Sequence, residues 1–334
     1  MLQGETDMKI GKVSENVLKR SILKQIKTKR KEVFIGAGVG EDCAILSLDG
    51  DEVFAVSTDP ITGTVNDIGK LAVVAATNDL AASGAEPIGI MVSALLPEKI
   101  EEPELRAMVQ QMEESCAKLH IQLMGGHTEI TKAVNQPVLT VTGVGKAKKD
   151  NLVTIKGAKP GQDIVITKWI GLEGTSIIAH AKEEELLTKY PIGLVEEAKN
   201  FEQFLSVIPE AATAVRSGVS AMHDVTEGGI FGALWEMAEG AGVGLEIDLK
   251  KIPVKQETIE ICEFFGINPY ELISGGSMLM VTENGYDLVR ALEQDGIPAT
   301  VVGKTTGNND RVVINEDERR FLEPSKPDEL YKVI

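Results

Sequence analysis

Alternating and helically spaced apolar residues predict most elements of the first half of the chain. β-Favouring residues flank Asp49-Gly50, a strong hairpin signal, and predict two paired strands at about 43–48 and 52–58. From residue 103 to 119 the apolar residues recur at helical spacing, which predicts an amphipathic helix. Further helices are expected near 14–28 and 68–83, and further strands near 88–95, 122–124 and 137–144.

The pattern breaks at the Lys- and Gly-rich stretch 156–161, where we place a domain boundary. The predicted domains are residues 1–157 and 158–334. The elements do not alternate strictly between strand and helix, so the fold class is mixed α/β (α+β) and not a doubly wound sheet. In the second half, strands are expected near 163–168, 243–248, 277–282 and 299–303, and helices near 174–184, 194–206, 228–240, 255–265 and 285–294.

Composition limits the classes of partner. The 334 residues, 43% of them hydrophobic, suffice for two packed domains. A net charge of −17 argues against nonspecific nucleic-acid binding, because such binding depends on neutralising phosphates. The three cysteines are widely spaced and form neither a disulfide framework nor a zinc site. Without a signal peptide or a long apolar run, we expect a cytoplasmic protein that does not enter a membrane.

Acidic residues converge at one end of the predicted hairpin. With the turn near 49–51, Asp42 lies opposite a residue between 56 and 59, so Asp42 and Asp59 share its open end. Neighbours across a strand pair are roughly 5–8 Å apart. Two carboxylates at that separation repel each other unless a cation lies between them. The alternative is a pair of exposed loop aspartates.

Asp79 falls on the helix expected at 68–83, four residues after Ala75 and eight after Leu71. These positions share one helix face, which we expect to be apolar and to face the core. A carboxylate there is costly unless it is paired, bound to metal or capping a new turn. Both capping of residues 80–83 and a metal–phosphate role are open.

Two glycine-containing segments carry further candidates. The run 125–129 follows a short strand, so a glycine turn presents His127, Thr128 and Glu129 at a strand end, where oxygen ligands suit Mg²⁺. The run 36–42, which includes Gly40, is suited to phosphate but is neither a Walker A loop nor a dinucleotide fingerprint. A plain turn and a flexible linker are the respective alternatives. Of the four histidines, His127 and His223 are the interesting pair.

The ordered set of motifs resembles the AIR synthetase (PurM-like) superfamily, and within it the HypE family of hydrogenase maturation factors. The matching stretches run in the family order from about residue 9 to residue 305. They are Gly40-Glu41-Asp42-Cys43-Ala44-Ile45, Ser57-Thr58-Asp59, Asp67-Ile68-Gly69-Lys70-Leu71-Ala72, Asn78-Asp79-Leu80-Ala81-Ala82-Ser83-Gly84-Ala85, Gly125-Gly126-His127-Thr128, His223-Asp224-Val225-Thr226-Glu227-Gly228-Gly229 and Trp235-Glu236-Met237-Ala238.

The resemblance implies a two-domain PurM-like protein that binds ATP and Mg²⁺. The N-terminal sheets of two subunits are expected to pair into a dimeric barrel, and the C-terminal domain to form an α/β sandwich. On this view Asp42, Asp59 and Asp79 are the Mg²⁺ ligands, and Asp79 is also catalytic. Lys70, for which a helix-surface position is the alternative, joins a nucleotide-binding set of Gly40, Lys70, Asn78, Gly125, Gly126, Thr128, His223, Asp224, Gly228 and Gly229.

Two departures from the family pattern limit what the resemblance implies. HypE proteins carry the reacting group on a cysteine in a short tail, whereas residues 321–334 contain no cysteine. His127 replaces an aspartate, so we expect it to contact phosphate or transfer a proton, with Glu129 restoring the carboxylate. The implied function is ATP-dependent activation of an amide or carbonyl group on a separate substrate or on a hydrogenase maturation partner. The alternatives are a non-catalytic ATP-binding assembly module, AIR-synthetase-like ring closure and small-molecule phosphorylation.

Overall fold

The computed structural model describes residues 11–12, 17–35, 37, 45–46, 50–62, 68–323 and 327–334. The chain divides into two compact units. Met1–Leu80 and Ala85–Asn151 form the first unit, and Ala81–Gly84 and Leu152–Ile334 form the second. The limits given above for the domains, 1–157 and 158–334, stay a prediction.

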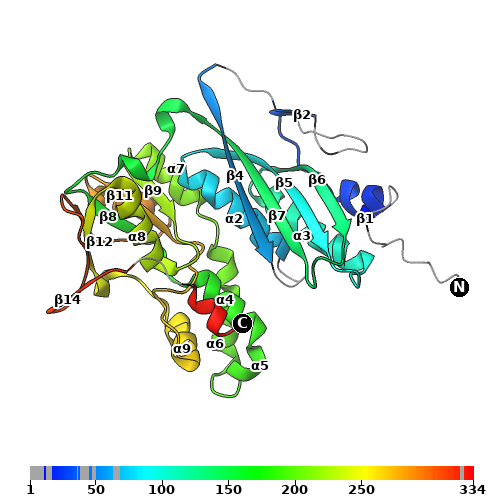
Figure 1. The fold of residues 1–334 in the computed structure, drawn as a ribbon. Helices are drawn as coiled ribbons and strands as arrows, with labels where there is room; N and C mark the ends of the chain where they lie inside the picture. The colour runs from blue at the N-terminus through cyan, green and yellow to red at the C-terminus, as the bar shows by residue number, and fades with distance from the viewer. Residues whose placement is uncertain are drawn as a thin grey trace, which may run out of the picture. The chain divides into compact units, whose positions relative to one another are not determined.

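The first unit contains a five-stranded sheet with the strand order β1-β6-β5-β7-β4 (Figure 1). β5 and β6 are parallel, and the other neighbours are antiparallel. A separate two-stranded sheet pairs β2 (Val33–Ile35) with β3 (Ile45–Leu46). The strands of the larger sheet are β1 (Gly11–Lys12), β4 (Glu52–Thr62), β5 (Glu86–Leu96), β6 (Gln122–Ile130) and β7 (Val138–Lys148).

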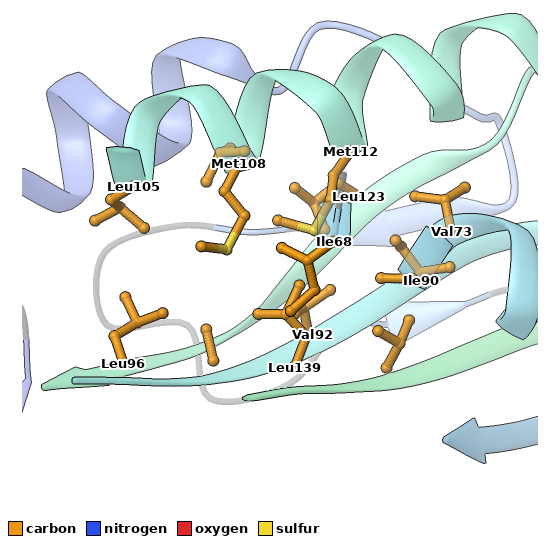
Figure 2. Packing of buried hydrophobic residues seen from close by; sticks show 14 of the residues in the cluster. Ile68, Val73, Ile90, Val92, Leu96, Leu105, Met108, Met112, Leu123 and Leu139 are labelled. Carbon is orange, nitrogen blue, oxygen red and sulfur yellow. The ribbon is translucent and has the colours of Figure 1, made fainter. Parts of the chain in front are cut away.

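Two helices, α2 (Ile68–Ala82) and α3 (Glu102–Lys118), pack on one face of this sheet. α3 begins at a capping box between Glu101 and Glu104. Its buried side chains, among them Leu105, Met108 and Met112, point toward the strands (Figure 2). The apolar residues whose helical spacing predicted this element therefore form its core-facing stripe. The predicted helix at 14–28 is, in the described residues, two short turns, η1 (Leu18–Ile22) and η2 (Leu23–Gln25).

The predicted hairpin of residues 43–48 with 52–58 is wrong in the described part of the chain. β3 pairs with β2, whereas β4 pairs along all eleven residues with β7. The turn at Gly50, with φ 64°, therefore does not join paired strands. Strand pairing depends on which distant segment offers a complementary face, and the 11-residue β7 matches the alternating burial of β4 along its length.

Glycines bring α2 close to the sheet. A Cβ atom on Gly143 of β7 would lie 2.7 Å from the carbonyl oxygen of Ala76 on α2. The buried residues of α2 are Ile68, Gly69, Ala72, Val73, Ala76, Thr77, Asn78, Leu80, Ala81 and Ala82. Leu71, Ala75 and Asp79, which we expected to share a core-facing side of the helix, are all half-buried.

The second unit is built on a seven-stranded sheet with the order β14-β13-β10-β12-β8-β11-β9 (Figure 1). Its strands are β8 (Asp163–Thr167), β9 (Ala221–Asp224), β10 (Gly244–Asp248), β11 (Met278–Thr282), β12 (Ala299–Thr306), β13 (Arg311–Asn315) and β14 (Glu318–Phe321). Its α-helices are α4 (Leu172–Ala181), α5 (Glu183–Leu186), α6 (Ile192–Lys199), α7 (Ile208–Arg216), α8 (Gly229–Ala241), α9 (Gln256–Phe265) and α10 (Gly285–Gln294).

Most of these elements lie where the sequence predicted them, but α7, β9, β13 and β14 were not expected. α7 is short and has a proline at its second residue, so the spacing of its apolar residues gives only a weak signal for a helix. No helix in the described part of the chain combines the length and the apolar character needed to span a lipid bilayer.

Candidate functional site

Strand β4 directs Ser57 and Asp59 toward α2. Ser57 pairs with Gly143 and Asp59 with Val141, and Val141 is part of the buried core between sheet and helices. Because cross-strand partners point to the same face, Ser57 and Asp59 share the helix-facing side. The Ser57 hydroxyl donates a hydrogen bond to Oδ2 of Asp79 and lies 3.3 Å from Oδ2 of Asp59. The structure thus brings two of the predicted metal ligands to one hydroxyl.

This arrangement places two negative groups on a single donor. A serine hydroxyl has one proton and can donate to only one carboxylate at a time. The second carboxylate then lies close to the first while the hydroxyl proton is bonded to the other. The repulsion between the two negative charges favours a cation between them. Carboxylate and hydroxyl oxygens are hard ligands of the kind that Mg²⁺ prefers, with water or phosphate completing the coordination. Asp59, Asp79 and Ser57 therefore fit part of a magnesium site.

The third predicted ligand, Asp42, and the predicted phosphate contact Gly40 lie outside the described residues. Among the residues that are described, no group of three histidine, cysteine, aspartate or glutamate side chains could hold a metal ion. The pair Asp59–Asp79 is consequently the part of the predicted metal site for which the structure gives geometry.

Two further candidates lie on α2. Asn78 is buried with 3% of its surface exposed, beside Asp79 in the sequence. Lys70 is half-buried in the first turn of the helix. Nine residues separate Lys70 from Asp79, which corresponds to about 13 Å along the helix axis. The structure therefore keeps Asn78 near the carboxylate pair and places Lys70 at the other end of α2.

The segment 125–129 is not a turn at a strand end, as the sequence suggested, but a continuous part of β6. A Cβ atom on Gly126, whose φ is 146°, would lie 1.8 Å from the carbonyl oxygen of Val92. Glycine is required there because β5 and β6 approach closely. Beside it, the adjacent Gly125 has a φ of 159°, and a Cβ atom there would lie 3.7 Å from Ala37.

His127 and Glu129 lie together on the other face of the sheet. His127 Nε2 is 3.6 Å from Glu129 Oε2, and the two residues pair with Ser93 and Leu95 of β5. Thr128 pairs with the buried Ala94 and faces the helices, as Asp59 does. The described strands therefore bring Thr128, but not His127 or Glu129, to the face of the sheet that carries the carboxylates. The roles assigned to His127 and Glu129 stay predictions.

In the second unit, His223 and Asp224 lie on β9, an outer strand of the sheet. His223 Nε2 is 2.9 Å from Oε2 of Glu236 on α8, and its Nδ1 is 3.9 Å from Oδ1 of Asp224. Asp224 is buried with 6% exposure. The histidine is thus held between two carboxylates, one of them in the interior.

Gly228 and Gly229 form the turn at which α8 begins. Both adopt left-handed conformations, with φ of 83° and 61°. A Cβ atom on Gly229 would lie 2.6 Å from the Tyr270 carbonyl oxygen and 2.8 Å from that of Leu272. Only glycine fits at this position, because the left-handed conformation and the close backbone both exclude a side chain.

Sequence reasoning missed two acidic residues beside this turn. The Gly228 N–H donates to Oδ2 of Asp328 at 2.7 Å, and the Gly275 N–H donates to Oε2 of Glu173 at 3.2 Å. Burial raises the pKa of Glu173 to about 7, and the negative charges of Asp328 and Asp224 add to this effect. Burial also raises the pKa of Asp328. No motif marks either residue, because the contacts arise from segments about 100 residues apart.

Two profiles of one protein family match the chain. The N-terminal domain of AIR synthase related protein matches residues 40–147, and the C-terminal domain of AIR synthase related protein matches residues 159–315. The chain belongs to the AIR synthase related family. Both profiles cover the segments that carry the motifs, so the resemblance inferred from those motifs is confirmed.

Individual members of the AIR synthase related family extend this finding. A putative hydrogenase expression/formation protein of Methanocaldococcus jannaschii is 28% identical over 313 residues, which cover 91% of this chain and 91% of the relative. The carbamoyl dehydratase HypE of Cupriavidus necator is 26% identical over 293 residues, which cover 85% of this chain and 79% of the relative.

Among solved structures, that of the hydrogenase maturation protein HypE in complex with ATP matches with a TM-score of 0.80. The identity is 20%, and the match covers 97% of each chain. The mixed α/β fold with two PurM-like domains, expected from the resemblance, is confirmed by this likeness. The pairing of two subunits into a barrel stays a prediction.

Proposed function

We propose that this protein is an enzyme that uses ATP and Mg²⁺ to activate an amide or carbonyl oxygen by phosphoryl transfer. The convergence of Asp59 and Asp79 on the Ser57 hydroxyl carries the proposal. Membership of the AIR synthase related family and the likeness to carbamoyl dehydratase HypE support the same reaction class. Enzymes of phosphoryl transfer work mainly by positioning and by neutralising charge, which is the role that two carboxylates around a divalent ion perform.

In this proposal Asp59 and Asp79 hold Mg²⁺, with Asp42 as a third ligand. The bound ion would neutralise charge on the ATP phosphates and polarise the phosphorus that is attacked. Ser57 orients the two carboxylates through its single hydroxyl. The buried amide of Asn78 and the hydroxyl of Thr128 supply neutral contacts to the phosphates.

The other nucleotide contacts stay those that the resemblance implied. In the first unit they are Gly40, Lys70, Gly125 and Gly126. In the second unit they are His223, Asp224, Gly228 and Gly229, and the turn before α8 is the segment we propose to contact the nucleotide there.

The group that is activated is best sought outside the described cysteines. Cys116 and Cys262 are both buried, and burial raises the pKa of the Cys116 thiol well above its usual value and that of Cys262 to about 12. A thiol that is neither exposed nor ionised cannot carry a reacting group. We therefore propose that the acceptor is a separate small molecule or a group on a hydrogenase maturation partner protein. Cys43 lies outside the described residues.

A non-catalytic assembly module that retains ATP is the second candidate. The placement of His127 and Glu129 on the face opposite Asp59 favours it, because a catalytic proton-transfer group belongs beside the reacting phosphate. ATP binding without ADP release in the presence of any acceptor or partner would identify this function. A ring-closing synthetase or a small-molecule kinase would instead consume ATP with its own acceptor.

The test measures ADP release with ATP, Mg²⁺ and a panel of carbamoyl and amide compounds. We expect Asp59→Asn and Asp79→Asn each to lower the rate by about 100-fold or more, because each removes a charge that holds the ion. Asp51→Asn, an exposed aspartate at the turn before β4, is the matched control and should react like the wild type. Wild-type rates in both variants of the pair would reject the proposed function.

A further inference from the structure

The carboxylate of Asp328 joins two segments of the second unit that are far apart in the sequence. Its Oδ2 accepts a hydrogen bond from the backbone N–H of Gly228, in the turn before α8, at 2.7 Å. Asp328 Oδ1 also accepts from the N–H of Leu330 at 2.9 Å, which caps the short helix η7 (Glu329–Lys332). Only 2% of Asp328 is exposed. One buried side chain therefore links the turn before α8 to a segment about 100 residues further along the chain.

The neighbours of Asp328 hold it in this position. Leu330 and Val333 pack against the buried cluster of α4, α6 and α9. The side-chain carboxylate of Glu329 accepts a hydrogen bond from the Asn268 N–H at 3.1 Å. The backbone N–H of Glu329 donates to the Glu271 carbonyl oxygen. These contacts are made by residues that follow Asp328, and they fasten residues 329–333, which helps to hold the carboxylate against Gly228.

The Gly228-Gly229 turn, which binds this carboxylate, is weakly stabilised by its own contacts. Gly228 and Gly229 both adopt left-handed conformations, and glycine has the largest conformational freedom to lose on ordering. Within the turn, the Gly229 N–H donates to the Thr226 carbonyl oxygen, and the Ser274 N–H donates to that oxygen as well. The N–H of Gly228 is the group that Asp328 binds. Loss of this acceptor would free the first residue of the turn.

We propose that Asp328 is a positioning residue that fixes the Gly228-Gly229 turn for nucleotide binding. This inference rests on the proposed function, in which that turn contacts the nucleotide. The carboxylate presets the backbone that the nucleotide meets and thereby removes an ordering cost from binding. Residues 327–334 are thus part of the binding machinery of the second unit although they lie about 100 residues beyond the turn.

The structure also decides against the opposite role, in which Asp328 competes with phosphate for the Gly228 N–H. Displacing Asp328 would break its bond to Leu330 and expose Leu330 and Val333. A buried carboxylate whose following residues are anchored by apolar contacts serves as a fixed part of the site and is poorly suited to release. The two roles predict opposite changes in affinity when the carboxylate is removed.

The test compares Asp328→Ala and Asp328→Asn with the wild type in full-length protein. Calorimetry gives the Kd of ATP with Mg²⁺, and hydrogen exchange with mass spectrometry follows a peptide covering 225–231. We expect Asp328→Ala to raise the Kd about tenfold or more and to speed exchange in that peptide. Asp328→Asn keeps one acceptor oxygen, which can serve Gly228, but turns an NH2 donor toward the Leu330 N–H, so we expect a smaller rise in Kd than for Asp328→Ala.

Asp248→Ala is the matched control, because Asp248 also caps a short helix, accepting from the Lys250 N–H on the same unit. It should leave both readouts unchanged. Should Asp328→Ala fail to fold, Asp328→Glu displaces the acceptor oxygens by one methylene and should show the same losses. Wild-type affinity in the folded Asp328 variant, or tighter binding, would overturn the inference. Absence of ATP binding by the wild type would instead refute the proposed function. In that case the exchange measurement still tests the positioning role, because unchanged exchange of the 225–231 peptide in Asp328→Ala would overturn it.

Discussion

At the scale of single residues, the site depends on shared protons and on buried carboxylates. Ser57 serves two aspartates with one hydroxyl, and Asp328 serves the backbone N–H groups of Gly228 and Leu330 with one carboxylate. The sequence revealed Asp59 and Asp79 because each belongs to a short family motif. It did not reveal Ser57 as their common partner, since that contact depends on how α2 lies against β4.

Glu173 gives the clearest residue-scale prediction on pH. Burial raises its pKa from an ordinary value near 4.5 to about 7, so the folded state binds a proton that the unfolded state releases. The free energy of unfolding should therefore fall as pH rises from about 4.5 to about 7. Glu173→Gln removes this dependence, and its melting temperature relative to the wild type should be higher at pH 8 than at pH 5.

Thermal unfolding at the two pH values measures this difference. Glu184→Gln, which changes an exposed glutamate on α5, is the control. It should shift the melting temperature by the same amount at both pH values. A constant difference between Glu173→Gln and the wild type across the range would contradict the assignment.

At the scale of elements, local patterns succeeded where the element buries one regular face. α3 was predicted almost to the residue because Leu105, Met108 and Met112 repeat at helical spacing. The hairpin failed because pairing is a long-range choice, and β4 found its partner in β7 about 85 residues away. Gly125 and Gly126 suggested a turn, yet both lie within β6, and Gly126 serves the close approach of β5 and β6. A glycine inside a strand can therefore mark a close approach of another backbone and not a bend.

Gly143 connects the packing of α2 on the sheet with the position of Asp79. A side chain there would press on the Ala76 carbonyl oxygen and move α2 away from the sheet, taking Asp79 from Ser57. We expect Gly143→Ala to lower the free energy of unfolding by about 1–3 kcal/mol and to weaken ATP binding in Mg²⁺. Denaturant unfolding and calorimetry test both effects.

Gly193→Ala is the matched control, because a Cβ atom at this position in α6 meets nothing within 4 Å. It should leave ATP binding unchanged and stabilise the helix by about 1 kcal/mol or less. Equal behaviour of the two variants would show that the approach of α2 to β7 does not position Asp79.

At the scale of the whole molecule, the family resemblance predicted the fold and its two domains, and the structural likeness confirms them. The predicted homodimer is consistent with the surface of the first unit. On β4, the outer strand of its sheet, Phe54 is 46% exposed and Val56 is 64% exposed, both on the face opposite Asp59. Apolar side chains on an open sheet face are the kind of surface that a second copy covers.

Light scattering tests the homodimer. Val56→Asp should convert the dimer to monomers, because it places a charge in the proposed sheet-to-sheet contact. Ile192→Asp, at an equally exposed isoleucine of the second unit, should remain dimeric. A wild type that stays monomeric with ATP bound would contradict the predicted barrel.

The central claim is that Asp59 and Asp79 bind ATP through a shared Mg²⁺ ion, and a calorimetric titration of ATP tests it most directly. We predict that the wild type binds ATP in Mg²⁺ and loses binding in EDTA. Asp79→Asn should bind at least about tenfold more weakly, and Asp51→Asn should match the wild type. Equal affinity of the wild type and Asp79→Asn, or binding that survives EDTA unchanged, would contradict the account.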